Sequence, residues 1–467
     1  MIPIIAAFLP FISSAQNDPP CFFSENFDGT SVPGTWLNTS VQQFDNTGTP
    51  LGTYVDAWTV NGADTANANG NFPVPFRTGH GNFAMANDDA GACDCDMLDV
   101  KLTSPVIALT GKLNCALECN VFLDQNFLGG EAHIQASADG TNWTDVRTIT
   151  STGHTWQPVF IDLAAFDGSD TLQLRFIWTD NGQWAAGFSV DDVCVYERLA
   201  NDLALVDAQM ADVTVDAFDG SQRGEVYRLI PVQECGASDQ IVSATVLNRG
   251  TTMLTDVSVT ADAVVAGSQV AINTSNAIAS LAPGERATLT VDLGWAPDVP
   301  GEVIFHWSAQ SIGTEDEPAN QAWSDSLLVT DQGFDNGNHQ MAIDRSGDDG
   351  SIGLPGDKFS LGNRYELEGS GEMVTGILVR YDDATAEGSQ VRARLMDGFF
   401  NELATGDVVE VSNDDLFTSS WTTDMVYLPF TVPYGPVTGD VFAMFESTPD
   451  SGAVRIACSG ASPYGAS

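Results

Sequence analysis

The chain has 467 residues, with 63 Asp and Glu against 17 Lys and Arg, and a formal net charge of -46. A surface this negative repels nucleic-acid phosphates and anionic lipid headgroups, which disfavours nucleic-acid binding and basic membrane docking. Because 43% of the residues are hydrophobic and only 17% are charged, the composition predicts folded domains rather than disorder. At roughly 150 residues per domain, the length predicts about three domains.

The negative charge is spread evenly along the chain. The net charge is -17 over residues 17–199, -15 over 200–331 and -14 over 332–467. Two interpretations are open for these acids. Most of them are expected to form a solubilising surface suited to a salty exterior, and a smaller set is expected to bind divalent cations.

The N-terminus predicts export. Residues 2–12 form an apolar run that is followed by Ser13-Ser14-Ala15, a small-residue cleavage signal. The run is too short to span a bilayer. We therefore interpret 1–15 as a signal peptide and expect a secreted or outer-surface protein that begins near Gln16.

Eight cysteines suit an oxidising destination, and six of them lie in the first segment. These six are Cys21, Cys93, Cys95, Cys115, Cys119 and Cys194. They allow fifteen pairings, and the sequence does not choose among them. Because Cys21 and Cys194 flank the segment, a bond between its first and last strands is the favoured hypothesis. A zinc site at Cys93, Cys95, Cys115 and Cys119 is a weak alternative, because the spacing does not match a finger or ribbon.

Apolar and polar residues alternate in many segments, which is typical of half-buried strands. The apolar positions are Ala132, Ile134 and Ala136; Leu172, Leu174 and Phe176; Val257, Val259 and Ala261; Leu289, Val291 and Leu293; and Val391, Ala393 and Leu395. Turn signals such as Asp139-Gly140, Asn181-Gly182 and Pro283-Gly284 separate such segments. The sequence therefore predicts an all-β fold of three tandem antiparallel β-sandwiches, at 16–199, 200–331 and 332–467.

The first segment contains an ordered set of motifs. They are C-F-F-S-E-N-F-D at 21–28, Trp58, G-H-G-N-F-A at 79–84, L-T-S-P at 102–105 and G-F-S-V-D-D-V-C at 187–194. This succession resembles the MAM-like, cleaved-adhesin jelly-roll domains of secreted Bacteroidetes proteins. The resemblance implies a jelly roll with a binding or adhesive function.

The second segment contains N-D-L-A-L at 201–205, V-L-N-R-G at 246–250, L-A-P-G-E at 281–285, Trp295 and E-D-E at 315–317. This order resembles a CARDB-like immunoglobulin-type sandwich. The third segment predicts a further sandwich that we assign to no family. Its last residues, 459–467, show no closing pattern, so we expect that the domain is truncated.

Clustered carboxylate and amide oxygens in loops are the ligands that Ca2+ prefers. The jelly-roll resemblance implies a structural calcium at acids of this kind, and pairing of the first and last strands would bring some of them together. The candidate ligands are Glu25, Asp28, Asn87, Asp88, Asp89, Asp191 and Asp192. Asp94, Asp96 and Asp99 are additional carboxylates nearby, whereas Asp348-Asp349 and Asp414-Asp415 are interpreted as ordinary turn acids.

Six of the ten tryptophans lie in the first segment, at 36, 58, 143, 156, 178 and 184. Tryptophan in a sandwich is usually a core residue, and Trp178 is in phase with the apolar positions before it. Trp184 follows the Asn181-Gly182 turn signal, so it is the candidate for contact with a ligand such as a sugar ring.

Catalytic motifs are not recognisable. The five histidines are scattered, and neither a zinc-binding H-E-x-x-H helix nor a G-x-S-x-G elbow occurs. His133 and His306 fall on the polar phase of their strands and are expected to be exposed.

Our leading hypothesis is a non-catalytic binding or adhesion protein that recognises an extracellular glycan, matrix protein or cell-surface protein. The alternative is a set of accessory modules of a secreted hydrolase, such as a peptidase, whose catalytic domain lies beyond Ser467. A carbohydrate-active enzyme is a third hypothesis.

Overall fold

The computed structural model describes residues 19–39, 42–44, 50–53, 58–62, 66, 72, 74, 81–87, 97–124, 130–150, 156–183, 185–210, 214–215, 222–223, 229–232, 235, 240–330, 351–352, 360–367, 373–381, 385–412, 415–416, 426–437, 439–448 and 454–457. This part of the chain is all-β, as the alternation predicts, with antiparallel sheets and short 3-10 helices at Ala164–Phe166 and Pro318–Gln321. Within it, no helix is long and apolar enough to cross a membrane. The predicted signal peptide, 1–15, lies outside the described residues.

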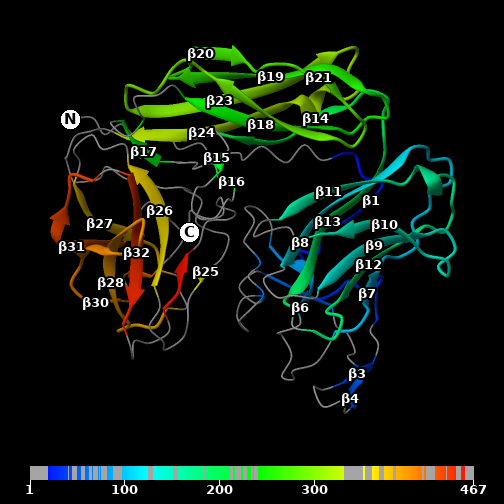
Figure 1. The fold of residues 1–467 in the computed structure, drawn as a ribbon, viewed down its shortest axis with the longest axis horizontal. Coiled ribbons are helices and arrows are strands. Elements are labelled where there is room, and N and C mark those ends of the chain that lie inside the picture. Colours follow the sequence, from blue (N-terminus) through cyan, green and yellow to red (C-terminus); the bar gives the residue numbers. More distant parts are fainter. Residues whose placement is uncertain are drawn as a thin grey trace. The chain divides into compact units, whose positions relative to one another are not determined.

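The first sandwich (blue to green in Figure 1) contains two facing sheets. Its strands are β1 (Phe23–Glu25), β2 (Leu37–Thr39), β3 (Gln42–Phe44), β4 (Pro50–Thr53), β5 (Trp58–Asn61), β6 (Phe83–Asn87), β7 (Val100–Thr103), β8 (Cys115–Asp124), β9 (Glu131–Ser137), β10 (Thr144–Ile149), β11 (Gln157–Asp162), β12 (Gln173–Thr179) and β13 (Gly187–Glu197). One sheet has the order β11-β8-β13-β6-β5 and the other β10-β9-β12-β7-β2. The eight strands β6 to β13 form the four-stranded orders β6-β13-β8-β11 and β7-β12-β9-β10, with a hairpin between β9 and β10, and this is the expected jelly roll.

The core between these sheets includes the apolar positions that the alternation predicted. Ile134, Leu174 and Phe176 are fully buried, and so is Trp178, in agreement with its phase. Trp58 packs edge-on against Phe188, with ring centres 5.8 Å apart. Because one face of each sheet is buried, the register of every strand is fixed and its alternate side chains are directed outward.

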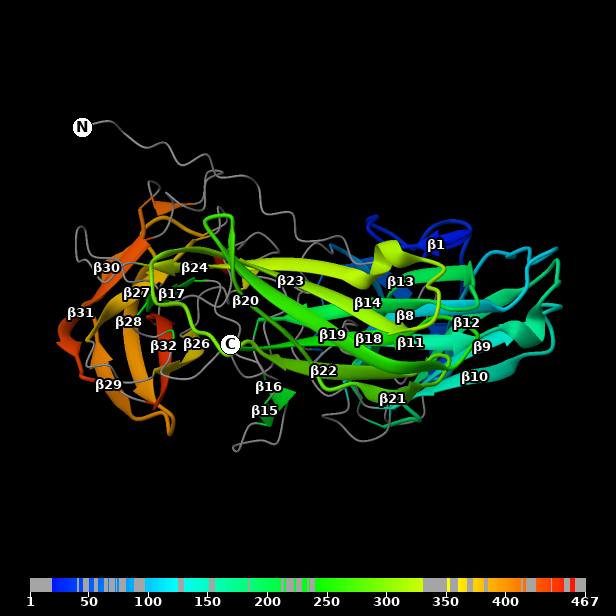
Figure 2. The ribbon, with the colours of Figure 1, turned by 90° about the horizontal axis from the view of Figure 1, so that it is seen from above.

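The second sandwich pairs a three-stranded sheet with a six-stranded one, whose long strands β19, β23 and β24 lie alongside one another (Figure 2). Its strands are β14 (Leu203–Gln209), β17 (Leu229–Pro231), β18 (Ile241–Asn248), β19 (Leu254–Val265), β20 (Ser268–Thr274), β21 (Ile278–Leu281), β22 (Arg286–Asp292), β23 (Gly301–Ile312) and β24 (Ala322–Thr330). The short strands β15 (Thr214–Val215) and β16 (Gln222–Arg223) pair with each other in a sheet of their own. The pair β17-β24 is parallel. Phe305 and Trp307 are buried in its core, and His306 between them is exposed, as predicted.

The third sandwich (orange to red in Figure 1) has a central sheet of order β26-β32-β28-β29 that faces the pair β27-β31. Its strands are β25 (Ser351–Ile352), β26 (Ser360–Leu367), β27 (Val374–Val379), β28 (Gln390–Asp397), β29 (Glu402–Thr405), β30 (Val409–Glu410), β31 (Val426–Tyr434), β32 (Gly439–Ser447) and β33 (Ile456–Ala457). Val391, Ala393 and Leu395 face its core, again on the predicted phase.

The chain divides into two compact units. One comprises Met1–Pro19, Leu199–Val213 and Tyr227–Met341, and the other comprises Pro20–Arg198, Thr214–Val226 and Ala342–Ser467. Every described sheet lies within one of the three predicted segments. The exact segment boundaries and the CARDB-like assignment stay predictions.

Candidate functional site

The outer face of the five-stranded sheet in the first sandwich carries a group of polar side chains. In β9 and β12 every second residue is buried in the core, so the alternate residues lie on the outer face. These outward residues include His133 and Gln135 on β9 and Arg175 on β12. The face is therefore largely polar across its central strands, although Ile177 of β12, opposite His133, is apolar and buried.

One row of planar polar groups crosses three strands of this face. Gln135 lies directly opposite Asp145 on β10 and opposite Arg175 on β12. The Nε of Arg175 donates to the side-chain carbonyl of Gln135 over 3.0 Å, and the amide of Gln135 donates to Asp145 over 2.7 Å. Because each group orients the next, the row presents fixed hydrogen-bonding edges.

Trp143 lies at this row. The Arg175 guanidinium stacks over its indole ring, with the guanidinium carbon 3.9 Å from the ring centre. The turn before it is fixed by Asp139, whose carboxylate accepts hydrogen bonds from the backbone of Thr141 (2.8 Å) and Asn142 (2.7 Å). These bonds, with Asn142 the strongest contributor, hold the pKa of Asp139 well below its usual range. The half-buried Trp143 ring is thus held in place.

A second row of polar side chains crosses the same face two residues further along β9, at His133. The hydroxyl of Thr148 is 3.3 Å from the Nδ1 of His133, and the Nε2 of His133 is 3.7 Å from the carboxylate of Glu131. His133 is half-buried, whereas the sequence predicted an exposed side chain, because its neighbours on β10 and β12 cover part of the ring. We call Trp143, Gln135, Asp145, Arg175 and His133 together the Trp143 face.

A second candidate site lies where β1 and β6 meet β13. Both strands pair with β13, β6 at residues 187–190 and β1 at 193–195. Asp191 and Asp192 lie between them at an irregularity of the ladder, and Glu25 is opposite Val193. The first and last strands are therefore adjacent, as expected from the resemblance. Asp28 follows β1, and its carboxylate lies beside Gly81, just before β6. We call Glu25, Asp28, Asp191 and Asp192 the acidic junction.

The carboxylates of the acidic junction accept hydrogen bonds from nearby protein groups. Glu25 accepts from the indole of Trp36 over 3.1 Å. Asp192 accepts from the amide of Asn120 over 3.0 Å, and Asp191 accepts from the backbone N–H of Asp192 over 2.8 Å. Among the described residues, no three Asp, Glu, His or Cys side chains form a group that could hold a metal ion by themselves.

Asn87 does not belong to this junction. It lies opposite Gly187, so four residues of β13, on the order of 13 Å, separate it from Asp191. Its amide donates to the backbone of Ala66 over 3.3 Å. The predicted ligand set is thus divided between two ends of β6. Asp88, Asp89, Asp94 and Asp96 lie outside the described residues.

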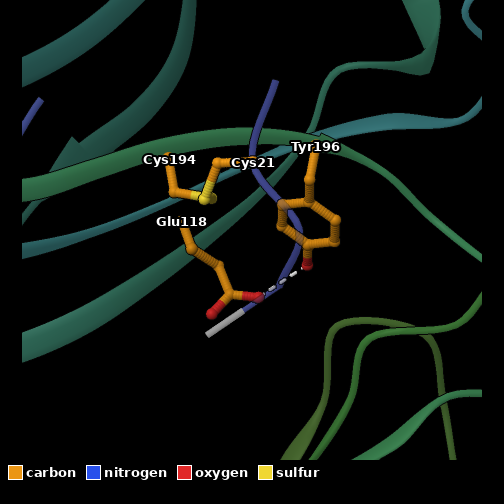
Figure 3. Close-up of a disulfide and its surroundings, with 4 residues drawn as sticks. All are labelled: Cys21, Glu118, Cys194 and Tyr196. Atoms are coloured by element: carbon orange, nitrogen blue, oxygen red, sulfur yellow. Dashed lines mark hydrogen bonds between the residues drawn. A yellow bond between two sulfur atoms is a disulfide. The ribbon is translucent and has the colours of Figure 1, made fainter. Parts of the chain in front are cut away.

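The disulfide Cys21–Cys194 confirms the favoured pairing. It joins Cys21, two residues before β1, to β13, next to the hydrogen bond that Tyr196 donates to Glu118 over 2.6 Å (Figure 3). Cys115 and Cys119 are free thiols, so their selection as disulfide candidates was wrong. Both lie on the core side of β8, where burial raises the pKa of the Cys115 thiol to about 12.

The remaining predicted residues belong to neither the Trp143 face nor the acidic junction. Trp184, Cys93, Cys95, Asp348, Asp349 and Asp414 lie outside the described residues. Asp415 accepts from the backbone and hydroxyl of Ser412, both over 2.8 Å, which fits a turn acid. Asp99 pairs with Lys101. No motif in the sequence brings the residues of the Trp143 face together as a site, although Gln135 and Arg175 occupy the polar phase of predicted strands.

Comparisons with known proteins give only distant likenesses. No family model matches the chain, and no curated protein matches it. Among solved structures, it is similar to the K1 cleaved adhesin domain of Lys-gingipain from Porphyromonas gingivalis, with 18% identity over 38% of this chain and 98% of that one and a TM-score of 0.26.

Two further solved structures show the same range of similarity. The carbohydrate-binding module TmCBM61, solved with β-1,4-galactotriose, has 12% identity, covers 37% of this chain and 94% of its own, and has a TM-score of 0.24. The exo-chitosanase CsxA of Amycolatopsis orientalis has 16% identity, covers 63% and 34%, and has a TM-score of 0.27. Likenesses this distant carry no argument about function.

Proposed function

We propose that this chain is an extracellular, non-catalytic binding protein whose first sandwich binds a neutral glycan on the Trp143 face. The observation that carries the proposal is the indole of Trp143 held beside the row of Asp145, Gln135 and Arg175. A sugar ring presents apolar C–H faces and equatorial hydroxyls. An aromatic ring packs against the C–H faces, and planar polar groups with fixed edges form hydrogen bonds with the hydroxyls.

The charges favour a neutral glycan over an anionic one. The first segment has a net charge of -17, which repels polyanions. On this face Lys101 is paired with Asp99, and Arg175 is already bonded to Gln135. The Cys21–Cys194 disulfide supports an oxidising, extracellular location.

Replacement of Trp143 tests this proposal. We expect Trp143→Ala in the full chain to weaken binding to a neutral polysaccharide at least about tenfold, or roughly 1.4 kcal/mol, because the stacking surface is lost. The measurement is affinity electrophoresis and calorimetry with soluble β-glucan, galactan, mannan and xylan. Arg175→Gln should weaken binding in the same way.

Leu113→Ala is the matched control, because Leu113 is 62% exposed and lies outside the five-stranded sheet. It should bind as the wild type does. Melting curves must show that Trp143→Ala still folds. If the wild type binds none of the four polysaccharides, or if both face variants bind normally, the proposal fails.

We also propose that the acidic junction binds a structural calcium ion. Since no three of the described carboxylates form a group that could hold an ion by themselves, one or two of Glu25, Asp28, Asp191 and Asp192 would supply carboxylate oxygens, and backbone carbonyls and water would complete the oxygen shell that calcium prefers. The pairing of β1 with β13 supports this proposal, because it brings Glu25 beside Asp191 and Asp192 at the irregularity in the middle of β13.

Calcium should therefore stabilise the full chain. After EDTA treatment, adding calcium at about 100 times its Kd should contribute about 2.7 kcal/mol, because the ion binds only the folded state. The midpoint of the corresponding transition should rise by roughly 5–10 °C in calorimetry. Asp191→Asn with Asp192→Asn should abolish the rise, and Asp170→Asn, an exposed acid elsewhere, should keep it. A wild type that shows no rise at millimolar calcium contradicts the proposal.

A further inference from the structure

Two phenylalanines project into solvent at the turn between β28 and β29 of the third sandwich. The side chains of Phe399 and Phe400 are 85% and 54% exposed. Exposure of two adjacent large apolar side chains at a turn is unfavourable unless they serve a contact. In the sequence GFFN at 398–401 the two rings are flanked by Gly398 and Asn401, which are not apolar side chains.

The turn is built to hold these rings outward. The carboxylate of Asp397 accepts hydrogen bonds from the backbone of Phe399 (2.9 Å) and Asn401 (2.8 Å), and from the side-chain amide of Asn401 (2.8 Å). Phe400 has a φ of 61°, a left-handed conformation that is costly for a bulky residue. Such strain persists only where the surroundings impose it, and it is concentrated at functional sites.

The aromatic surface extends onto the outer face of the central sheet. The ring of Phe400 stacks on Phe442 of β32, with centres 4.7 Å apart and an interplanar angle of 24°. Phe442 lies opposite Arg364 on one side, and the guanidinium of Arg364 donates to Asp440 over 2.6 Å. Aromatic rings and a fixed, planar ion pair therefore lie side by side.

These observations point to one class of ligand. We propose that the Phe399–Phe400 turn is a second glycan-contact site, at which a neutral pyranose stacks on the exposed rings. The ligand class rests on the proposed function, but the site is separate from the Trp143 face. The paired charges of Arg364 and Asp440 and the segment's net charge of -14 disfavour an anionic ligand or an anionic membrane.

Two contact sites on separate sandwiches would make binding to a polymer multivalent. The second contact then acts at the effective concentration set by the connection between the sandwiches, so affinity for a long chain exceeds that for a short oligosaccharide. Loss of either site should reduce polymer affinity much more than oligosaccharide affinity.

Full-length Phe399→Ala tests the second site. The ligand is whichever of the four soluble polysaccharides the wild type binds most tightly. We expect Phe399→Ala to weaken this binding by about tenfold or more. The melting temperature should stay unchanged because Phe399 is so exposed. Val432→Ala, at a position of β31 that is 70% exposed, is the matched control and should bind normally. Phe399→Ala and Val432→Ala are also each combined with Trp143→Ala, so that the contributions of the two sites to binding can be separated.

The outcomes are distinct. If Phe399→Ala weakens binding while Trp143→Ala does not, the second site stands and the proposed role of the Trp143 face fails. If Phe399→Ala binds all four polysaccharides as the wild type does, the second site is overturned. Binding to phosphatidylcholine vesicles that is lost in Phe399→Ala, without an effect on polysaccharides, would also overturn it and assign the turn to a lipid surface.

Discussion

Replacing Cys21 and Cys194 together by serine is expected to destabilise the first sandwich by about 3–5 kcal/mol. The disulfide links residues 173 positions apart, and the entropy that a cross-link removes from the unfolded chain grows with the logarithm of the loop length. For a domain of this size the melting temperature should fall by roughly 10 °C. Calorimetry of the full chain, with and without a reducing agent, measures the change.

The bond also holds a short strand in place. β1 contains only Phe23–Glu25, and Phe22 N–H donates to the carbonyl of Val195 over 3.0 Å immediately beside the disulfide. We expect the amide of Phe22 to exchange with deuterium much faster in the double variant, since little else fixes β1 at its N-terminal end. The acidic junction follows this strand, so calcium affinity should fall with it.

Cys115 is a free cysteine that forms no disulfide, so it supplies the control variant. Cys115→Ala removes a buried free thiol of the same sandwich and should cost about 1 kcal/mol, as a small loss of packing. The double variant should melt at the same temperature with or without reducing agent. A double variant that melts within a degree of the wild type would show that the disulfide contributes nothing to stability.

The fold could be predicted because its signals are local. Alternation with a period of two occurs within each strand, and the core requires it, so Ile134, Leu174 and Ala393 were placed correctly. The turns were equally local, since Gly140, Gly182 and Gly284 all have the positive φ that their turn signals predicted. Such features depend on neighbours in the sequence alone.

The Trp143 face could not be predicted because it depends on lateral register. Gln135 and Arg175 are 40 residues apart, and only the pairing of β9 with β12 brings them into contact. Asn87 shows the opposite case, because clustering in the sequence with Asp88 and Asp89 gave no information about which end of β13 it would meet. Residue type and phase select candidates, but strand order decides which of them form a site.

Replacement of Glu446 is expected to destabilise the third sandwich about as much as loss of the disulfide destabilises the first one. Its side chain is only 1% exposed, and it accepts hydrogen bonds from Arg392 Nε over 2.6 Å and from Arg394 Nη1 over 2.7 Å. Glu446→Gln removes the charge and leaves two guanidinium groups without their buried counter-ion. Loss of one partner from a buried ion pair costs about 3–5 kcal/mol, and the partial exposure of the arginines favours the lower value, about 3 kcal/mol.

Hydrogen exchange of the β28 and β32 amides measures this loss, because it reports the opening of the third sandwich separately from the rest of the chain. Glu402→Gln is the matched control. Glu402 also pairs with Arg394, at 2.7 Å, but its side chain is 42% exposed, so its removal should cost less than about 1 kcal/mol. If the two variants lose equal stability, burial of Glu446 does not determine the cost of removing its charge.

A third variant separates the value of the ion cluster from the cost of breaking it. When Arg392→Met, Arg394→Met and Glu446→Leu are combined, no buried charge of the cluster is left unpaired, and apolar side chains fill a similar volume. Glu402 loses Arg394, but its side chain is 42% exposed and solvated. Replacements of this kind are often neutral or stabilising, so stability close to that of the wild type is expected. A loss as large as that of Glu446→Gln would instead show that the cluster itself stabilises the sheet. In that case the outer face of the third sandwich would depend on its charges as the inner face depends on apolar packing.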